Sequence, residues 1–333
     1  MIADLGRRAF LSSLAAMSAA AAFRPRTARA QEAKRPKLRL AFKYNMIKIN
    51  GSVEDKLNLA KKLGMEGVEV DSPSTFNKDE VKAASKKTGI KIHGVIDSVH
   101  WRDTLSDLDE AVRAKGLAAL RGAIEDAAFF ECDTVLLVPG VVKDSVTYEQ
   151  CYERSQAEIK KVLPLAAERK IKILIETVGN NFITRPEQMI SFVNDLGSPW
   201  AGAYFDCSNM IRHGVSSAEW IRRLGKMMVK FDFKGFSKEK GRVPIGEGDE
   251  DWPEVLKALG EVGYDGWATS EVSGGGEAEL GAADGADVAG GAGTDHEDVV
   301  GHGLGAQRIR RLVPLSKGTR SRCTASVPRC SAP

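Results

Sequence analysis

The sequence predicts a (β/α)₈ barrel, a closed ring of parallel strands in which each strand is followed by a helix. Eight short apolar segments alternate with amphipathic segments between residues 38 and 271. Several of these segments are continuously apolar, as in strands that are covered on both faces. A doubly wound open sheet is the rival, but it more often has a Gly-rich turn after its first strand. This chain has Phe42-Lys43-Tyr44-Asn45 there, which favours the barrel.

The first half of the chain contains four strand–helix units. We expect strands at residues 38–42, 67–70, 90–95 and 134–138. Ser52 and Asn77 are suitable N-caps for the first two helices, because their side chains can accept backbone N–H bonds. The next helices are expected at 109–130 and 148–169. Pro164 lies within the last of these, so we expect a kink or break there.

The second half repeats the pattern. We expect strands at residues 171–176, 203–206, 228–232 and 266–271. Thr184 is the expected cap of a helix that has Pro186 early in its first turn, and further helices are expected at 217–224 and 251–263. Residues 277–280 could begin an eighth helix, but the pattern dissolves after them, so this helix is predicted to be missing or altered.

The composition restricts the class of protein. The 333 residues are 43% hydrophobic and 28% charged, which is ordinary for one large α/β domain. The net charge of +3 is nearly balanced, so nothing points to nucleic acid or to an anionic membrane surface. The five cysteines have no CxxC or CxxH spacing, which indicates neither a disulfide framework nor a zinc–cysteine site.

The two ends of the chain differ from the central domain, 31–280. Residues 1–30 contain Arg7-Arg8 before an Ala-rich apolar run and Ala28-Arg29-Ala30, a pattern typical of a cleaved twin-arginine signal. This predicts an exported, periplasmic protein; a frayed amphipathic N-terminus is the alternative. The apolar run is too short for stable membrane insertion. Residues 281–333 are predicted to be disordered, through a frame change or as a genuine tail.

Four carboxylates end four successive predicted strands: Glu176, Asp206, Asp232 and Glu271. Each spacing is about one strand–helix unit, so the side chains should meet at the carboxyl ends of neighbouring strands. Buried carboxylates need compensation, and a metal ion is a common one. Oxygen ligands favour Mn²⁺ or Mg²⁺, with Zn²⁺ or Co²⁺ as alternatives.

Several polar residues lie in loops on the same predicted face. His100 and Trp101 follow the third strand and could bind a ligand by a hydrogen bond and stacking, or Trp101 could simply anchor the loop. Asn181 and its neighbour Asn180 could bind substrate hydroxyls or satisfy a turn. His93 is interpreted as a core histidine.

Three segments carry a family resemblance. They are Phe205-Asp206-Cys207-Ser208-Asn209, Gly246-Glu247-Gly248-Asp249 with Asp251-Trp252-Pro253, and Gly263-Tyr264-Asp265-Gly266-Trp267 with Glu271. Across about residues 38–276 the chain resembles the xylose-isomerase-like TIM-barrel family, which comprises sugar (phosphate) isomerases and epimerases and endonuclease-IV-like enzymes.

The resemblance implies a metal set and a reaction. The family's metal-binding glutamates fall on Glu176 and Glu271 and its aspartate on Asp206, while Asp232 stands where many members have a histidine. A metal-dependent isomerase or epimerase would act through an enediolate, with Glu176 and Glu271 as the catalytic proton-transfer groups. Substrate contacts are expected from His100, Trp101, Asn181, Asn209 and Lys234. Asn209 replaces a histidine of the family, and Lys234 adds positive charge.

Other activities stay open at the level of sequence. An endonuclease-IV-like phosphodiesterase would need an imidazole-rich metal cluster, and the chain has five histidines. A dehydratase with the same metal geometry and a non-catalytic sugar-binding barrel are further alternatives. The expected partner is a small sugar or sugar derivative. The sequence does not specify which sugar, whether it is phosphorylated, or whether the protein forms a homo-oligomer.

Overall fold

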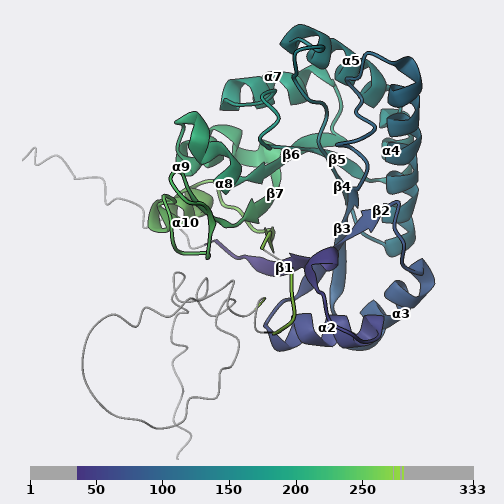
Figure 1. The fold of residues 1–333 in the computed structure, drawn as a ribbon, viewed down its shortest axis with the longest axis vertical. Helices are drawn as coiled ribbons and strands as arrows, with labels where there is room; N and C mark the ends of the chain where they lie inside the picture. The colour runs from purple at the N-terminus through teal and green to yellow at the C-terminus, as the bar shows by residue number, and fades with distance from the viewer. Residues whose placement is uncertain (1–35, 273, 278–279, 281–333) are drawn as a thin grey trace, which may run out of the picture. The chain divides into compact units, whose positions relative to one another are not determined.

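The predicted barrel is confirmed by a computed structural model, which describes residues 36–272, 274–277 and 280. Eight parallel strands close into a ring in the order β1-β10-β7-β6-β5-β4-β3-β2, and β1 pairs with β2 to complete it. Figure 1 shows the helices outside this ring. Strands that follow one another in the sequence are therefore neighbours in space, which brings the four predicted strand-end acids to adjacent strands.

The barrel strands agree with the predicted positions to within one or two residues at most ends. They are β1 (Arg39–Lys43), β2 (Gly67–Ser72), β3 (Lys91–Asp97), β4 (Thr134–Leu137), β5 (Lys172–Glu176), β6 (Ala201–Asp206), β7 (Met228–Phe233) and β10 (Trp267–Ser270). The longer helices are α2 (Val53–Lys62), α3 (Lys78–Thr88), α4 (Glu110–Phe130), α5 (Tyr148–Lys160), α6 (Leu163–Arg169), α7 (Pro186–Asp195), α9 (Ser217–Leu224) and α10 (Trp252–Glu261).

Local signals explain where most of these helices begin. The side chain of Ser52 accepts from the Asp55 N–H at 3.2 Å, and that of Asn77 accepts from the Asp79 N–H at 2.9 Å, as predicted. The expected break at Pro164 is also present, because α5 ends at Lys160 and a separate helix, α6, begins at Leu163. Proline removes a backbone donor and therefore interrupts the helix there.

The cap of α7 corrects the prediction. Arg185, not Thr184, is the N-cap residue. The reason is Gln188, whose Oε1 accepts from the backbone N–H of Arg185 at 3.0 Å and from that of Thr184 at 2.9 Å. The Gln188 side chain thus satisfies the two N–H groups that precede the helix, and the Thr184 hydroxyl donates to the same oxygen at 3.2 Å instead of accepting from the first turn.

Short elements that the sequence analysis did not predict decorate the carboxyl ends of the strands. A two-stranded antiparallel sheet of β8 (Gly235–Ser237) and β9 (Gly241–Val243) follows β7, and the one-turn helix α8 (Cys207–Met210) follows β6. Three-residue 3₁₀ turns lie at Tyr44–Met46, after β1, and at Ile211–His213, after α8, whereas a third, Gly225–Met227, lies before β7 at its amino end. The strand pair β8–β9 matters for function because it carries Arg242 next to the carboxylates described below.

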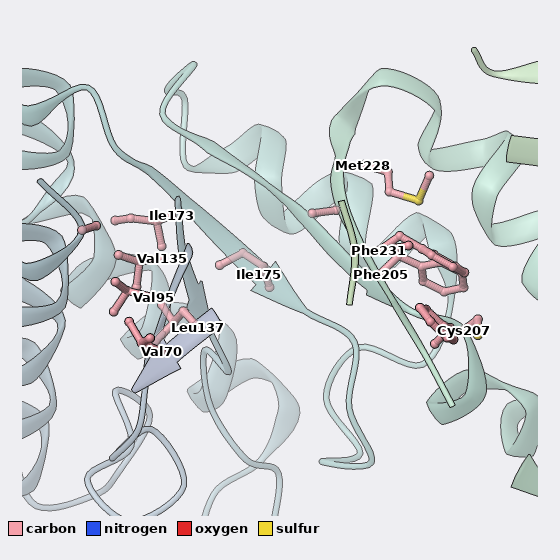
Figure 2. Close-up of a cluster of buried hydrophobic side chains, with 14 of the residues drawn as sticks. Val70, Val95, Val135, Leu137, Ile173, Ile175, Phe205, Cys207, Met228 and Phe231 are labelled. Carbon is pink, nitrogen blue, oxygen red and sulfur yellow. The ribbon is translucent and has the colours of Figure 1, made fainter. Parts of the chain in front are cut away.

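The main hydrophobic core lies between the strands and the surrounding helices. Alternate residues of each strand contribute to it, among them Val135 and Leu137 of β4 and Ile173 and Ile175 of β5. Figure 2 shows these four side chains as part of the core. The intervening positions point the other way, into the barrel.

The barrel interior holds only a small apolar cluster. It consists of Ile96, Leu136, Leu174 and Tyr204. The remaining interior positions include charged and polar side chains that are nearly inaccessible to solvent: Lys43, Glu69, His93, Thr134, Glu176, Asp206, Lys230, Asp232 and Thr269. A typical barrel of this class is filled with bulky branched residues, so this polar interior is unusual and costs folding free energy unless its groups are paired.

The structure covers only the start of the segment after the last barrel strand. The backbone N–H of Leu280 donates to the Gly276 carbonyl at 2.9 Å, which is the spacing of a helical turn, and Leu280 is buried. The predicted signal, residues 1–30, and the predicted tail, residues 281–333, lie outside the described residues. Within the described part of the chain, no helix combines the length and the apolar character needed to cross a membrane.

Candidate active site

Four carboxylates meet at the carboxyl ends of the barrel strands. Glu176 ends β5, Asp206 ends β6, Asp232 lies near the end of β7 and Glu271 follows β10. One oxygen from each lies within 4.8 Å of the corresponding oxygens of the others. The strands are neighbours in the order β5-β6-β7-β10, so the closure of the barrel converts four residues distant in sequence into one cluster.

Two buried lysines lie within the acid cluster. Lys43 Nζ at the end of β1 is 2.9 Å from Asp232 Oδ2, 3.6 Å from Glu271 Oε2 and 3.9 Å from Glu176 Oε1. Lys234 Nζ is 2.7 Å from Asp206 Oδ2 and 2.8 Å from Glu271 Oε2. The carboxylates are therefore bridged by two ammonium groups, although neither ammonium reaches all four.

Burial dominates the electrostatics of three of the acids. It raises the pKa of Glu176 well above its usual value, with the nearby Lys43 opposing the shift. Burial likewise raises the pKa of Asp206 to about 7 and raises the pKa of Asp232, against the opposing effects of Lys234 and Lys43 respectively. The two lysines therefore leave these carboxylates short of positive charge.

Glu271 is the exception. Its burial alone would raise its pKa, but Lys43 and Lys234 together lower the pKa of Glu271 well below its usual value. Arg242 of β9 also contacts it, with Nη2 2.9 Å from Glu271 Oε1. The cluster thus contains carboxyl groups whose proton affinities are pushed in opposite directions by their surroundings.

The donor set fits a hard divalent cation. Four carboxylates face two buried ammonium groups, which leaves a deficit of two positive charges; Arg242, 54% exposed, is screened by solvent. Asp232 Oδ2 is buried and accepts no hydrogen bond of good geometry, although Lys43 Nζ lies 2.9 Å away. Oxygen-only donors suit Mn²⁺ or Mg²⁺. These four residues could therefore hold a metal ion.

A cavity of about 540 Å³ opens directly over the cluster. This volume is within the range of small-molecule sites. Glu176 and Glu271 line the cavity, whereas Asp206 and Asp232 are fully buried beneath it. The other lining residues described come from the strands and from the loops and short elements that follow them: Lys43, Asn45, Met46, Asp71, Ile96, Ser98, His100, Trp101, Leu136, Val178, Gly179, Asn209, Lys234 and Arg242.

His100 has a defined tautomer in this cavity. Its Nδ1 accepts from the Val138 backbone N–H at 3.1 Å, and burial lowers the pKa of His100 to about 3, so the ring is neutral. A neutral imidazole that accepts at Nδ1 must carry its proton on Nε2. His100 therefore presents an N–H donor rather than a charge. Beside it, Trp101 is 51% exposed and lines the same cavity.

Asn209 and Lys234 also line the cavity. The Nδ2 group of Asn209 donates to Asp206 Oδ2 at 2.8 Å and to the Thr177 carbonyl at 3.0 Å. Asn181 is placed differently: it is an exposed turn residue with φ of 56°, and it is not one of the residues that line the cavity. The neighbouring Asn180 is buried and donates to the Gly140 carbonyl at 2.7 Å, so it stabilises the loop.

The sequence analysis missed the most central cation. Lys43 directly follows the apolar residues of β1, which is the same strand-end pattern that revealed the four acids. Applying that pattern to cations as well as to acids would have identified it. Tyr204 and Glu69 were missed for another reason, because each lies in mid-strand and their contact with each other crosses the barrel.

Comparison with known proteins identifies the family. The sequence profile of the xylose isomerase-like TIM barrel matches residues 57–289, more than half of the chain. The chain belongs to the xylose isomerase-like TIM barrel family. This confirms the family resemblance found in the sequence.

Related proteins in this family include sugar epimerases. The chain is 24% identical over 229 residues to L-ribulose-5-phosphate 3-epimerase UlaE of Salmonella paratyphi B, which covers 63% of this chain and 78% of that one. Its structure is similar to D-allulose 3-epimerase from Methylomonas sp. (18% identity, TM-score 0.59, 72% and 86% covered). It is also similar to D-psicose 3-epimerase from Clostridium cellulolyticum H10 (17% identity, TM-score 0.61, 73% and 89% covered).

Proposed function

We propose that the protein is a divalent-metal-dependent sugar epimerase that inverts a carbon next to a ketose carbonyl. The observation that carries the proposal is the cluster of four buried carboxylates under a small-molecule cavity, with two fewer positive than negative charges. The activities of the related epimerases support the same reaction class. Aldose–ketose isomerisation uses the same chemistry and is distinguished by the product formed.

The cation would be held by Glu176, Asp206, Asp232 and Glu271. When bound, it would polarise the substrate carbonyl and the neighbouring hydroxyl. This would acidify the hydrogen on the carbon that bears the hydroxyl, next to the carbonyl. The two acids at the floor of the cluster, Asp206 and Asp232, are inaccessible to a substrate. They are suited to holding charge rather than to exchanging protons with a sugar.

Glu176 and Glu271 are the proton-transfer groups in this proposal. Both line the cavity, so both can approach a bound sugar, and they come from the carboxyl ends of different strands, β5 and β10. One carboxylate removes the proton from carbon, and the other returns a proton to the opposite face. Inversion requires two groups or a reoriented substrate, and the site offers two groups.

Other lining residues would position the sugar. The Nε2–H of His100 can donate to a hydroxyl, and the exposed ring of Trp101 offers a surface for the apolar face of a pyranose or open-chain sugar. Lys43 and Lys234 lie at the boundary between cluster and cavity. Their ammonium groups can stabilise negative charge that develops on substrate oxygens during proton removal.

The decisive experiment measures proton exchange. The purified full chain, loaded with Mn²⁺, Mg²⁺ or Co²⁺, is incubated with a panel of ketoses and ketose phosphates in D₂O, and deuterium incorporation is followed by NMR. We expect incorporation at the carbon next to the carbonyl and formation of the epimer. Glu176→Gln and Glu271→Gln should each lower the rate at least about 100-fold.

Glu153→Gln is the control, because Glu153 is an exposed residue of α5. Its activity should match that of the unchanged protein. Sugar binding without any exchange would replace the proposal with a non-catalytic receptor. Full exchange in Glu176→Gln would refute the role assigned to that carboxylate.

A further inference from the structure

A continuous chain of polar contacts crosses the barrel interior below the cluster of four carboxylates. Its members, here called the interior chain, come from strands β3, β6, β7 and β10: Lys230, His93, Thr269, Tyr204 and Asp232. The side chains of Tyr204, Asp232 and Thr269 are completely buried, and those of Lys230 and His93 are nearly so. Burying polar groups of this kind costs folding free energy unless they are hydrogen-bonded to one another.

The chemistry of the groups fixes the direction of each contact. Lys230 Nζ lies 2.8 Å from His93 Nδ1, and an ammonium group can only donate. The neutral His93 ring must then carry its proton on Nε2, which faces Thr269 Oγ1 at 3.3 Å. Burial, aided by Lys230, lowers the pKa of His93 well below its usual value, which agrees with a neutral ring.

The same direction continues to the acid cluster. With its oxygen accepting from His93, the Thr269 hydroxyl donates to Tyr204 Oη at 3.0 Å. The Tyr204 hydroxyl has one proton, and its shortest carboxylate contact is Asp232 Oδ1 at 2.8 Å; Glu69 Oε2 lies 3.1 Å away. Every donor in the chain thus points toward Asp232.

The interior chain leaves the two oxygens of Asp232 in different environments. Oδ1 accepts from Tyr204, whereas Oδ2 accepts no hydrogen bond of good geometry and faces the cluster near Lys43. Carboxylates that bind metals are commonly held by a hydrogen bond to their second oxygen, which fixes the orientation of the first. A free Asp232 could rotate and lose that orientation.

We propose that Tyr204, backed by Thr269 and His93, is a positioning residue that holds Asp232 with Oδ2 facing the acid cluster that would bind the cation. The proposal rests on the metal site of the proposed function, and it goes further by assigning a role to residues that touch neither substrate nor metal. It also explains why the barrel carries a polar interior where branched apolar side chains are usual.

The test measures metal binding rather than turnover. Full-length protein is stripped with a chelator and titrated with Mn²⁺ by calorimetry, and the Co²⁺-loaded protein is compared by visible absorption. We expect Tyr204→Phe to weaken Mn²⁺ binding about 10- to 100-fold and to alter the Co²⁺ spectrum. Tyr264→Phe is the matched control. The buried hydroxyl of Tyr264 donates to the Trp267 carbonyl at 2.7 Å and is not part of the interior chain, so Mn²⁺ binding should be unchanged.

A second pair of variants keeps the test valid if Tyr204→Phe does not fold. Thr269→Val removes the hydroxyl that supports Tyr204, and Thr269→Ser restores it. We expect weaker Mn²⁺ binding in the first and recovery in the second. If Tyr204→Phe and Thr269→Val both had the Mn²⁺ affinity and the Co²⁺ spectrum of the unchanged protein, the positioning role would be overturned while the metal site stayed intact. No Mn²⁺ binding by the unchanged protein would instead overturn the metal site and the proposed function with it.

Discussion

Lys43 contacts three of the four carboxylates in the site, whereas Lys234 contacts two and Arg242 contacts one. The Lys43 ammonium lies within 4 Å of three carboxylates and is almost inaccessible to solvent. Burial alone would lower the pKa of Lys43, but Asp232, Glu176 and Glu271 raise it well above its usual value. The lysine therefore stays charged, and the acids depend on it.

Replacing Lys43 by methionine should destabilise the fold. The substitution leaves Asp232 buried without its nearest cation, and breaking a buried ion pair in this way costs about 3–5 kcal/mol. Urea unfolding in the presence of EDTA measures the change in free energy. Lys240→Met, at an exposed position between β8 and β9, should change it by less than about 0.5 kcal/mol. A neutral effect of Lys43→Met would show that the acids are protonated rather than ion-paired.

Asp97 is a second residue whose surroundings predict a measurable effect. It ends β3, is 1% exposed, and accepts a hydrogen bond from the Val99 N–H at 3.3 Å. Burial raises the pKa of Asp97 to about 7, only partly offset by that hydrogen bond. Because the folded state binds the proton more tightly than the unfolded state, this group stabilises the fold at low pH, and the contribution is lost as the pH rises through 7.

Asp97→Asn should therefore flatten the pH dependence of stability. A shift of about 3 pKa units corresponds to at most about 4 kcal/mol between pH 4 and pH 8. We expect the variant to gain stability relative to the unchanged protein at pH 8 and to lose that advantage at pH 4. Urea unfolding at several pH values tests this, and a stability difference that does not vary with pH would contradict it.

At the scale of elements, helix α4 offers two glycines in contrasting surroundings. A Cβ atom at Gly116 would lie 2.1 Å from the carbonyl oxygen of Asp103, which is a severe clash with backbone. A Cβ atom at Gly122, less than two turns further along, would meet nothing within 4 Å. The same residue type therefore serves close packing at one position and serves no contact at the other.

The two alanine variants should have opposite effects on stability. Gly122→Ala should stabilise the protein by about 0.5–1 kcal/mol, since alanine is the better helix former. Gly116→Ala should destabilise it by about 1–3 kcal/mol, because the loop that carries Asp103 must move. Thermal and urea unfolding of both variants provides the check. Equal effects of the two substitutions would show that the loop adapts to α4 without cost.

The elements also show how local sequence rules are modified by neighbours. Ser52 and Asn77 cap their helices as predicted, because each acceptor lies next to the N–H groups that it satisfies. Thr184 does not cap α7, because its hydroxyl donates to Gln188 Oε1 at 3.2 Å, an oxygen that also accepts from the N–H groups of Thr184 and Arg185. Local composition predicts where a helix begins to within a residue, but the side-chain contacts around its first turn decide which residue caps it.

At the scale of the whole molecule, metal binding should be coupled to folding. The four carboxylates come together only when the barrel closes, so a cation that they bind favours the folded state. Mn²⁺ at 100 times its dissociation constant should raise the free energy of unfolding by about 2.7 kcal/mol relative to protein in EDTA. Asp206→Asn should abolish most of this increment. An unchanged unfolding midpoint with and without Mn²⁺ would argue against the site.

The sequence by itself determined the class of fold, the family and the four acids. Eight apolar segments at regular spacing leave few topologies other than a barrel, and the strand-end position of each carboxylate places all four on one face. The position of Lys43 was equally accessible, since it ends β1 directly after the apolar residues of that strand. These features are local, so they can be recognised in the sequence without the structure.

Only the tertiary structure decided how the acids are supported. The contacts of Tyr204 with Asp232 and Glu69 join strands β6, β7 and β2, and β2 lies on the opposite side of the ring from β6. Such contacts depend on the register between strands and on the width of the closed barrel, which no stretch of sequence specifies alone. The same is true of Asn181, which has a φ of 56° in an exposed turn and does not line the cavity, although Val178 and Gly179 do.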